Sequence, residues 1–264
     1  GISGLCVSVD RQRDKVWIGA RADMAQTGLD ENAEKIIVCR SGFISAIGTV
    51  MLPKVSRRTR MKQMDAVKRH IRLSMELVMC MVCAMAFGLA AVAVNFAPLF
   101  YGDDFAYSGT LMMPLAFTLL SIGFANVIRT QWVLPQGRDT IFVHSVLTGA
   151  VINLIANFVL IPPFGAMGAA AATVLAEISV PAVQFVYLRK ELPYAQHLKT
   201  TGVYCLFGLV MAGAVALLGH VLPLHGWWKL ALQVTGGAAV YGVLCLTYWK
   251  LAKRSDIFRL MRRK

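Results

Sequence analysis

The sequence predicts an all-α integral membrane protein, a polytopic antiparallel helix bundle of about seven spans. Hydrophobic residues make up 57% of the 264 residues and charged residues only 16%, against about 25% in an ordinary soluble domain. The apolar residues gather in runs of about 20, the length that crosses a hydrocarbon core of about 30 Å. The formal charge of +13 is concentrated in alternate connections between these runs, as in polytopic membrane proteins.

The first 35 residues form the least regular part of the pattern. Charged residues, among them Asp10, Arg13, Asp14 and Lys15, interrupt residues 1–20, so this stretch does not make a clean span. Two interpretations remain open, the polar inner end of a helix whose first half is missing and a surface segment. Because the chain opens with Gly1 instead of Met, we expect a fragment or a processed chain. Residues 1–35 are therefore assigned to a truncated helix and an external connection.

The remaining chain divides by its apolar runs. Seven runs meet the length of a span: 36–55, 73–96, 107–134, 140–161, 166–188, 200–222 and 230–249. The first five form a predicted bundle over residues 36–188, and the last two form a final pair over residues 200–249. A basic loop at 189–199 separates the two groups, and a basic tail occupies 250–264. Short connections rich in Gly and Pro, such as 162–165, place consecutive helices antiparallel.

The basic residues predict which side each connection occupies. Most of the 27 Lys and Arg residues fall within 53–72, 189–199 and 250–264, whereas 97–106 and 162–165 contain none. The positive-inside rule then places these basic connections, with 135–139, in the cytoplasm. Connections 20–35, 97–106, 162–165 and 223–229 face outward, and the C-terminus is cytoplasmic. The basic tail is expected to attract anionic membrane lipid. The apolar excess argues against nucleic acid as a partner.

Polar residues deep within a span are costly and face a bundle interior or a wet cavity. Glu177 is the deepest, and it shares a helical stripe with Thr173, Pro181 and Gln184. It is either a protonatable or cation-binding carboxylate lining a path, or a carboxylate satisfied by a neighbouring helix. On the preceding span, Gly149, Asn153 and Asn157 recur every four residues. The two asparagines either line the path or hydrogen-bond between helices, and the second interpretation is favoured.

Two arginines lie within predicted spans. Arg129 lies on a stripe with Asn126 near the cytoplasmic end of its run, and Arg40 lies near the outer end of the first run. A guanidinium matches a phosphate with two parallel hydrogen bonds, so each is a candidate anion contact. Snorkelling of the long side chain to the interface explains both equally well. Glu76 follows Arg72 by four residues, which favours an interfacial ion pair.

No arrangement of residues predicts an enzyme. The six cysteines are scattered, and Cys80 and Cys83 have a metal-like spacing without a second pair of ligands. The histidines do not cluster, and the glycine-rich stretch 165–171 lacks the Lys-Ser/Thr of a phosphate-binding loop. We therefore expect transport instead of catalysis, with no metal site and no cofactor.

An ordered set of short stretches resembles a known family. These stretches are 31–36, 47–56, 129–135 and 149–157, the last continuing through 161–170 to Glu177. They are similar to the lipid-linked oligosaccharide flippases of the multidrug/oligosaccharidyl-lipid/polysaccharide exporter superfamily, and they cover about residues 14–190. Members have about fourteen spans, arranged as two six-helix lobes and a final pair. The resemblance implies that this chain is the second lobe with that final pair.

The resemblance also implies a function. Members of this family are thought to move undecaprenyl-diphosphate-linked sugar units from the inner to the outer leaflet by alternating access, which implies a bacterial cytoplasmic membrane. Under this interpretation Arg129, Arg40, Asn126, Asn153 and Asn157 are candidates for contact with the lipid-linked oligosaccharide. Glu177 and Asp14, which lies at the end of the helix opening the lobe, are candidates for coupling to a proton or sodium ion. A glycan polymerase is a candidate partner.

Three other functions stay open at this stage. A cation-coupled multidrug exporter of the same superfamily has the same fold, and the mixed charges within the spans do not exclude it. A membrane enzyme of polyprenol or sugar chemistry is disfavoured because no long extramembrane loop carries paired acids or histidines. A non-catalytic membrane subunit of a glycan assembly complex is the remaining alternative.

Overall fold

The computed structural model describes residues 61, 63–221 and 226–251, and every element in this part of the chain is helical. Six helical segments are long and apolar enough to cross a membrane, which confirms the predicted all-helical, multi-pass class. The elements are α3 (Met64–Tyr101), η1 (Asp103–Phe105), α4 (Ala106–Ala116), α5 (Thr118–Ile128), the π-helical turn η2 (Arg129–Val133), η3 (Leu134–Gln136), α6 (Asp139–Phe164), α7 (Ala166–Leu188), α8 (Tyr194–Val221) and α9 (Gly226–Leu251).

The predicted runs correspond to these segments in order. Helix α7 begins and ends at the predicted residues, and the runs 73–96, 140–161 and 230–249 lie inside longer helices. At about 1.5 Å per residue, the 38 residues of α3 reach well beyond a core of about 30 Å. The run 36–55 lies outside the described residues.

Two stretches that the sequence predicts as connections between helices are partly helical in the structure. The stretch 162–165 is not a loop, because α6 continues through Pro162 and Pro163, and Gly165 alone turns the chain with φ at 56°. Because proline has no backbone N–H, Pro162 and Pro163 cannot donate to the carbonyls four residues earlier, and α6 ends at Phe164, one residue after them. The stretch 189–199 is also partly helical. The carbonyl of Pro193 accepts the first bonds of α8, from the amides of Gln196 and His197.

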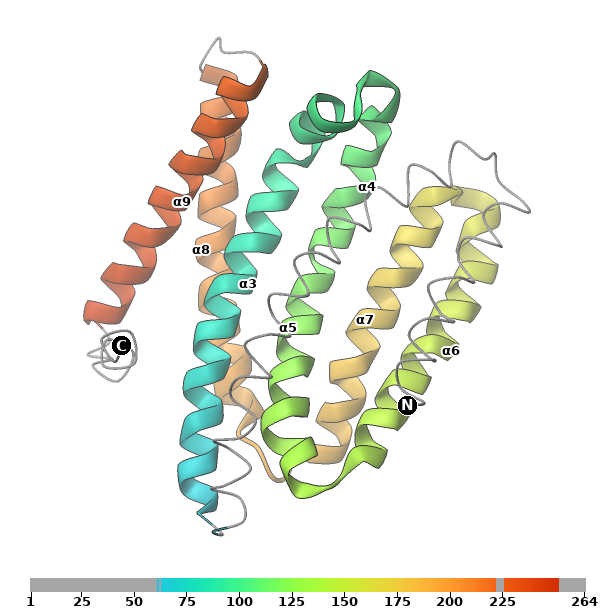
Figure 1. Ribbon diagram of the computed structural model, residues 1–264, viewed down its shortest axis with the longest axis vertical. Helices are drawn as coiled ribbons and strands as arrows, with labels where there is room; N and C mark the ends of the chain where they lie inside the picture. The colour runs from blue at the N-terminus through green and yellow to red at the C-terminus, as the bar shows by residue number, and fades with distance from the viewer. Residues whose placement is uncertain (1–60, 62, 222–225, 252–264) are drawn as a thin grey trace.

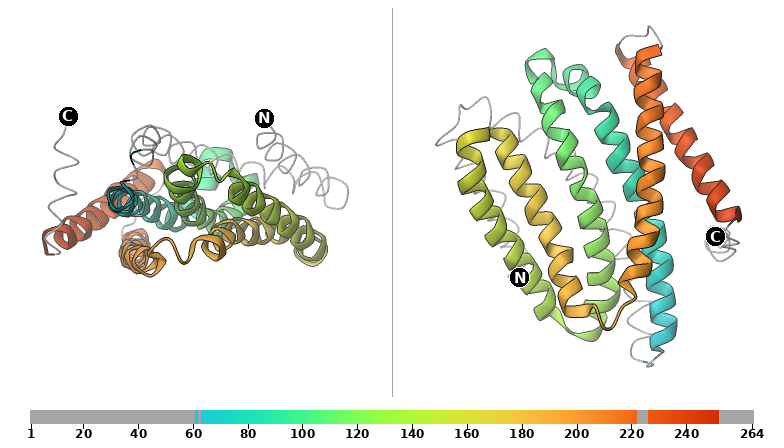
Figure 2. Two further views of the ribbon diagram at one scale, coloured as in Figure 1. Left: turned by 90° about the horizontal axis from the view of Figure 1, so that it is seen from below. Right: turned by 180° about the vertical axis from the view of Figure 1, so that it is seen from behind.

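Helix α3 is the central element of the described part. It packs against α4 and α5 on one side and against α8 and α9 on the other, while α7 joins α6 to the α4–α5 pair. Figure 1 shows the resulting order across the molecule, from α9 through α8, α3, α5 and α7 to α6. The view from below places α9 and α6 at opposite ends (Figure 2). The residues between Met64 and Tyr101 therefore form the contact between the final helix pair and the rest.

Glycines mark the closest helix contacts. Gly109 of α4 lies against the backbone of Ala93, and Gly123 of α5 lies against the side chain of Val82, both on α3. Gly208 of α8 lies under the ring of Phe87. In a membrane the helices gain little from excluding water between them, so close backbone approach at small residues supplies much of the packing.

Polar contacts join α3 to the final pair. Glu76 is only 2% exposed and accepts a hydrogen bond from the Tyr204 hydroxyl at 3.2 Å, and Trp249 Nε1 donates to Tyr204 at 2.8 Å. Sequence analysis favoured an interfacial ion pair with Arg72, but Arg72 is exposed while Glu76 is buried. Tyr204 of α8 thus links Glu76 of α3 to Trp249 of α9.

The same seam contains close thiol pairs. The Sγ atoms of Cys80 and Cys245 are 3.6 Å apart, and those of Cys83 and Cys205 are 3.8 Å apart. All four are free thiols. Cys80 and Cys83 of α3 thus pack against a cysteine of α9 and a cysteine of α8, respectively.

Gly168 offers a test of the α6–α7 packing. A Cβ at this position would meet the backbone of Leu160 and Ile161 in α6, which cannot move aside as a flexible side chain can. Gly168→Ala is therefore expected to lower the melting temperature in detergent by several degrees, since overpacking costs about 1–3 kcal/mol. Gly202→Ala is the matched control, because a Cβ at Gly202 meets nothing within 4 Å. Equal melting temperatures for the two variants would contradict the packing described here.

Candidate functional site

Arg129 occupies the first position of the π-helical turn η2, directly after α5. Its guanidinium lies over the ring of Phe142 in α6, with the Cζ atom 4.0 Å from the ring centroid. The side chain is half-buried, and within the described part of the chain its Nε makes no hydrogen bond. A guanidinium that is stacked on an aromatic ring and has an N–H group without a hydrogen bond is suited to bind an anion.

Asn126 lies one turn before Arg129 and is also half-buried. The backbone carbonyl of Asn126 accepts a hydrogen bond from the Thr130 hydroxyl at 2.7 Å, which links the end of α5 to the π-helical turn. Asn126 and Arg129 thus lie within one turn of each other, as the predicted stripe requires. Whether Asn126 contacts a substrate stays a prediction.

Asn153 and Asn157 are buried on the side of α6 that packs against α7. Asn157 Nδ2 donates to Asn153 Oδ1 at 2.7 Å, so the two amides form a pair along one helix. On the same stripe, a Cβ at Gly149 would lie 3.4 Å from the carbonyl oxygen of Ala176. This burial favours the interpretation in which the asparagines hold the α6–α7 hairpin together.

Glu177 lies in the middle of α7 and is half-buried. The register of the hairpin fixes its depth, because Gly149 packs against Ala176 and Gly168 packs against Leu160. Asn153 therefore lies between these two contacts, whereas Glu177 lies one residue beyond Ala176, near the depth of Gly149 and about 6 Å along the hairpin from Asn153. Helix α7 runs through Pro181 without a break.

The described candidates form two levels instead of one cluster. Phe142, the platform for Arg129, precedes Asn153 by eleven residues in α6, which is about 16 Å along the helix axis. The lower level holds Arg129 and Asn126, and the upper level holds Asn153 and Asn157, while Glu177 lies between them near the depth of Gly149. Two further candidates, Arg40 and Asp14, lie outside the described residues, so their place relative to either level stays a prediction.

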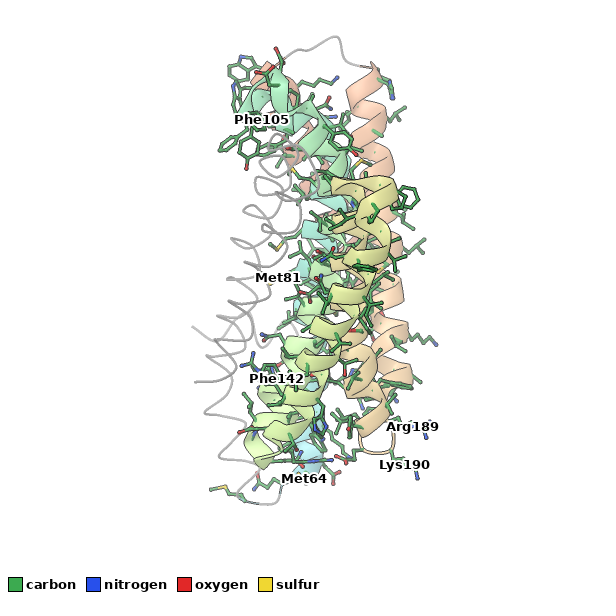
Figure 3. The ribbon with its side chains drawn as sticks, turned by 90° about the vertical axis from the view of Figure 1, so that its right-hand side faces the viewer. Met64, Met81, Phe105, Phe142, Arg189 and Lys190 are labelled. Atoms are coloured by element: carbon green, nitrogen blue, oxygen red, sulfur yellow. The ribbon has the colours of Figure 1, made fainter. Side chains whose placement is uncertain are left out.

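The labelled side chains separate two faces of the described part. Phe142 and Met81 project from one face, whereas Arg189 and Lys190 project from the opposite one (Figure 3). Because Arg129 is stacked on Phe142, it belongs to the first face. The exposed cations of the α7–α8 connection are therefore not part of the Arg129 level.

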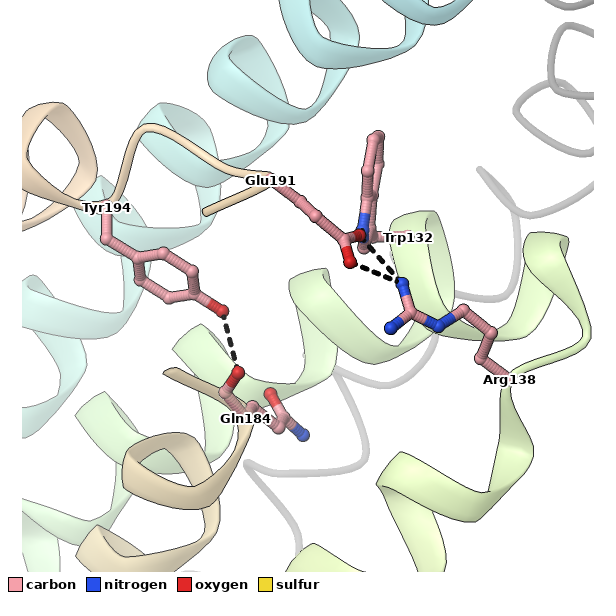
Figure 4. A network of polar contacts seen from close by, with 5 residues as sticks. All are labelled: Trp132, Arg138, Gln184, Glu191 and Tyr194. Carbon is pink, nitrogen blue, oxygen red and sulfur yellow. Dashed lines mark hydrogen bonds and ion pairs between the residues drawn. The ribbon is translucent and has the colours of Figure 1, made fainter. Parts of the chain in front are cut away.

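A network that sequence analysis missed lies next to this level. Trp132 Nε1, in the π-helical turn, donates to Glu191 Oε2 at 2.9 Å. Arg138, just before α6, donates from one Nη atom to both carboxylate oxygens of Glu191, at 2.8 and 2.7 Å (Figure 4). Lys68 of α3 lies 5.9 Å from the centroid of the Trp132 ring. Glu191 thus joins the α7–α8 connection to the turn between α5 and α6.

The charge state of Glu191 follows from its neighbours. Partial burial raises the pKa of this carboxyl, but hydrogen bonds from Arg138 and Trp132 and attraction to Arg138 and Lys68 outweigh it, so the pKa is lowered overall. Glu191 is therefore ionised at neutral pH. Beyond it, the hydroxyl of Tyr194 lies 3.4 Å from the carbonyl oxygen of Gln184, a contact that continues the link into α7 (Figure 4).

The described residues show what chemistry this region supports. No group of three or more His, Cys, Asp or Glu side chains is placed to hold a metal ion in residues 61, 63–221 and 226–251. The polar groups instead suit the binding of an anion at the lower level and hydrogen bonding at the upper level.

Comparison with known families gives a match over most of the chain. A family model described as lipid II flippase MurJ matches residues 31–236. The solved structure of a lipid II flippase MurJ in its inward closed conformation has the same fold, with a TM-score of 0.76 and 16% sequence identity. The superposition covers 90% of this chain and 50% of that one.

Two curated proteins have similar sequences. The probable low-salt glycan biosynthesis flippase Agl15 of Haloferax volcanii is 22% identical over 235 residues, which cover 89% of this chain and 50% of that protein. A putative O-antigen transporter of Shigella dysenteriae is 22% identical over 148 residues, or 56% of this chain and 36% of that protein. The chain thus spans half or less of the length of these curated relatives.

Proposed function

This chain belongs to the lipid II flippase MurJ family, and from this premise we propose that the whole protein moves an undecaprenyl-diphosphate-linked oligosaccharide from the inner to the outer leaflet. The family match over residues 31–236 is the observation that carries the proposal. The family consists of transporters, not enzymes. The two similar proteins are named for glycan export, which favours a glycan cargo over a drug.

The arrangement of the lobe supports this proposal. The chain spans about half of the solved flippase structure it matches, and we propose that it forms the second lobe with the final helix pair. Alternating access then needs the first lobe as the opposing half. The basic connections place the C-terminus in the cytoplasm of a bacterial plasma membrane under this proposal.

The residues divide the work between the two levels. Arg129 contacts the diphosphate, since its guanidinium carries a fixed positive charge and its Nε has no hydrogen bond within the described residues. Arg40 and Asn126 extend this contact, while the buried Asn153 and Asn157 hold the α6–α7 hairpin together above it. Glu177 and Asp14 couple the movement to a proton or sodium gradient. A glycan polymerase takes up the exported unit.

A reconstitution experiment tests this function. The intact protein is placed in liposomes that carry a fluorescent lipid-linked oligosaccharide in the inner leaflet and a membrane-impermeant quencher outside. We expect the protein to move the oligosaccharide to the outer leaflet, where the quencher reduces its fluorescence. Liposomes without protein are the control for spontaneous movement. Export of a cationic dye together with an unmoved oligosaccharide would instead support the multidrug exporter, and movement of neither would leave the assembly-subunit alternative.

A further inference from the structure

The π-helical turn η2 holds Arg129 and Trp132 in one widened turn. Such turns are uncommon, and they occur frequently at functional sites. Arg129 extends toward Phe142, whereas Trp132 is only 4% exposed and is anchored by its indole N–H. The position of Arg129 therefore depends on a turn whose other large side chain is fixed by Glu191.

The second end of the same segment is also fixed by Glu191. The amide of Arg138 donates to the carbonyl of Val133 at 3.2 Å, which closes the end of the π-helical turn. The carbonyl of Arg138 accepts from the amide of Ile141 at 3.0 Å, which starts α6. Phe142, the platform for Arg129, is the next residue. By binding the Arg138 side chain with both oxygens, Glu191 fixes the start of the helix that carries Phe142.

Because Glu191 holds Trp132 and Arg138 together, we propose that it is a positioning residue for Arg129, which it does not need to touch. It sets the guanidinium over Phe142 by holding the turn that carries Arg129 and the helix start that carries the ring. The ligand at Arg129 is the diphosphate of the lipid-linked substrate, so this inference rests on the proposed function. Ordinary sequence patterns hide this role, since Glu191 is a single acid within a basic connection.

The test measures the transport rate against substrate concentration for the intact protein in liposomes. In Glu191→Gln the side-chain carbonyl still accepts from Trp132, but the amide group no longer attracts Arg138. We expect KM for the diphosphate-linked substrate to rise on the order of tenfold, because small misplacements of a binding group are costly. Asp65→Asn, which removes an exposed acid from the first turn of α3, is the matched control and keeps KM unchanged.

A double-mutant cycle separates positioning from a structural role. If Glu191 acts through Arg129, adding Glu191→Gln to Arg129→Ala leaves the already raised KM unchanged. Loss of folded protein alone would lower the maximal rate at constant KM, and that result would overturn the inference. Additive effects in the double variant would overturn it as well. An unchanged KM in Arg129→Ala itself would overturn the diphosphate contact of the proposed function, and the positioning role with it.

Discussion

Arg129→Ala is expected to reduce export of the lipid-linked oligosaccharide by about 30-fold or more in the intact protein. Removing one partner of a desolvated charge pair costs about 2–5 kcal/mol, because the other charge loses its compensation. The Phe142 ring would lose its stacked guanidinium but keep its place in α6. The loss is measured in liposomes as the rate at which the fluorescent lipid-linked oligosaccharide becomes accessible to the external quencher. The amount of inserted protein is determined in parallel.

Lysine at the same position gives an intermediate result. Arg129→Lys keeps the positive charge but loses the planar fork that holds two phosphate oxygens and stacks on an aromatic ring. We therefore expect a partial defect, smaller than that of alanine.

Arg189→Ala is the control for charge alone. Arg189 is exposed and projects from the face opposite to Phe142 (Figure 3), so its loss leaves the rate unchanged. Full export by Arg129→Ala would remove Arg129 from the mechanism.

The spanning helices could be predicted from the sequence because hydropathy reports directly on the membrane environment. Helix α7 matches its predicted run 166–188 at both ends, since Gly165 precedes it and the charged pair Arg189 and Lys190 follows it. The prolines 162 and 163 were misleading as loop signals. A proline removes the bond to the carbonyl four residues earlier wherever it stands in a helix, but in the last turn this loss ends α6 instead of kinking it.

The candidate site was only partly predictable, because contacts between connections leave no periodic signal. Arg129 stands out as a charge within an apolar run, so sequence analysis finds it. Glu191 lies beside Arg189 and Lys190, where a single acid looks like part of a solvated loop. Only the fold brings it to Trp132 and Arg138, which lie more than fifty residues earlier in the chain.

The contact of Glu76 is a second one that spacing within the sequence does not predict. Its spacing to Arg72 favours an ion pair along one helix, and nothing local shows that Tyr204 reaches it from α8. The separation of these two residues by 128 positions hides the contact from any pattern within one helix. Tertiary packing decides whether such a carboxylate faces the interface or another helix.

Glu177→Gln is expected to abolish the dependence of export on an ion gradient while leaving the abundance of the protein in the membrane unchanged. A carboxylate within a span is costly unless it is neutral or paired, so we expect Glu177 to alternate between a bound and a released cation. Pro181, one turn further along α7, removes one helical donor nearby. Glutamine keeps the size and the hydrogen-bonding capacity of the side chain, but it cannot bind or release a proton.

The structural alternative makes the opposite prediction for this same variant. Glu177 lies near the depth of Gly149 in the α6–α7 hairpin, about one helical turn from Asn153, which is the nearer of the two buried asparagines. If it serves only to hold the hairpin, glutamine preserves both transport and its response to an imposed proton or sodium gradient. Asp104→Asn, which removes an exposed acid from η1, controls for a general effect of lost negative charge. A gradient response in Glu177→Gln equal to that of the wild type would remove Glu177 from coupling, because the response would then arise at another residue.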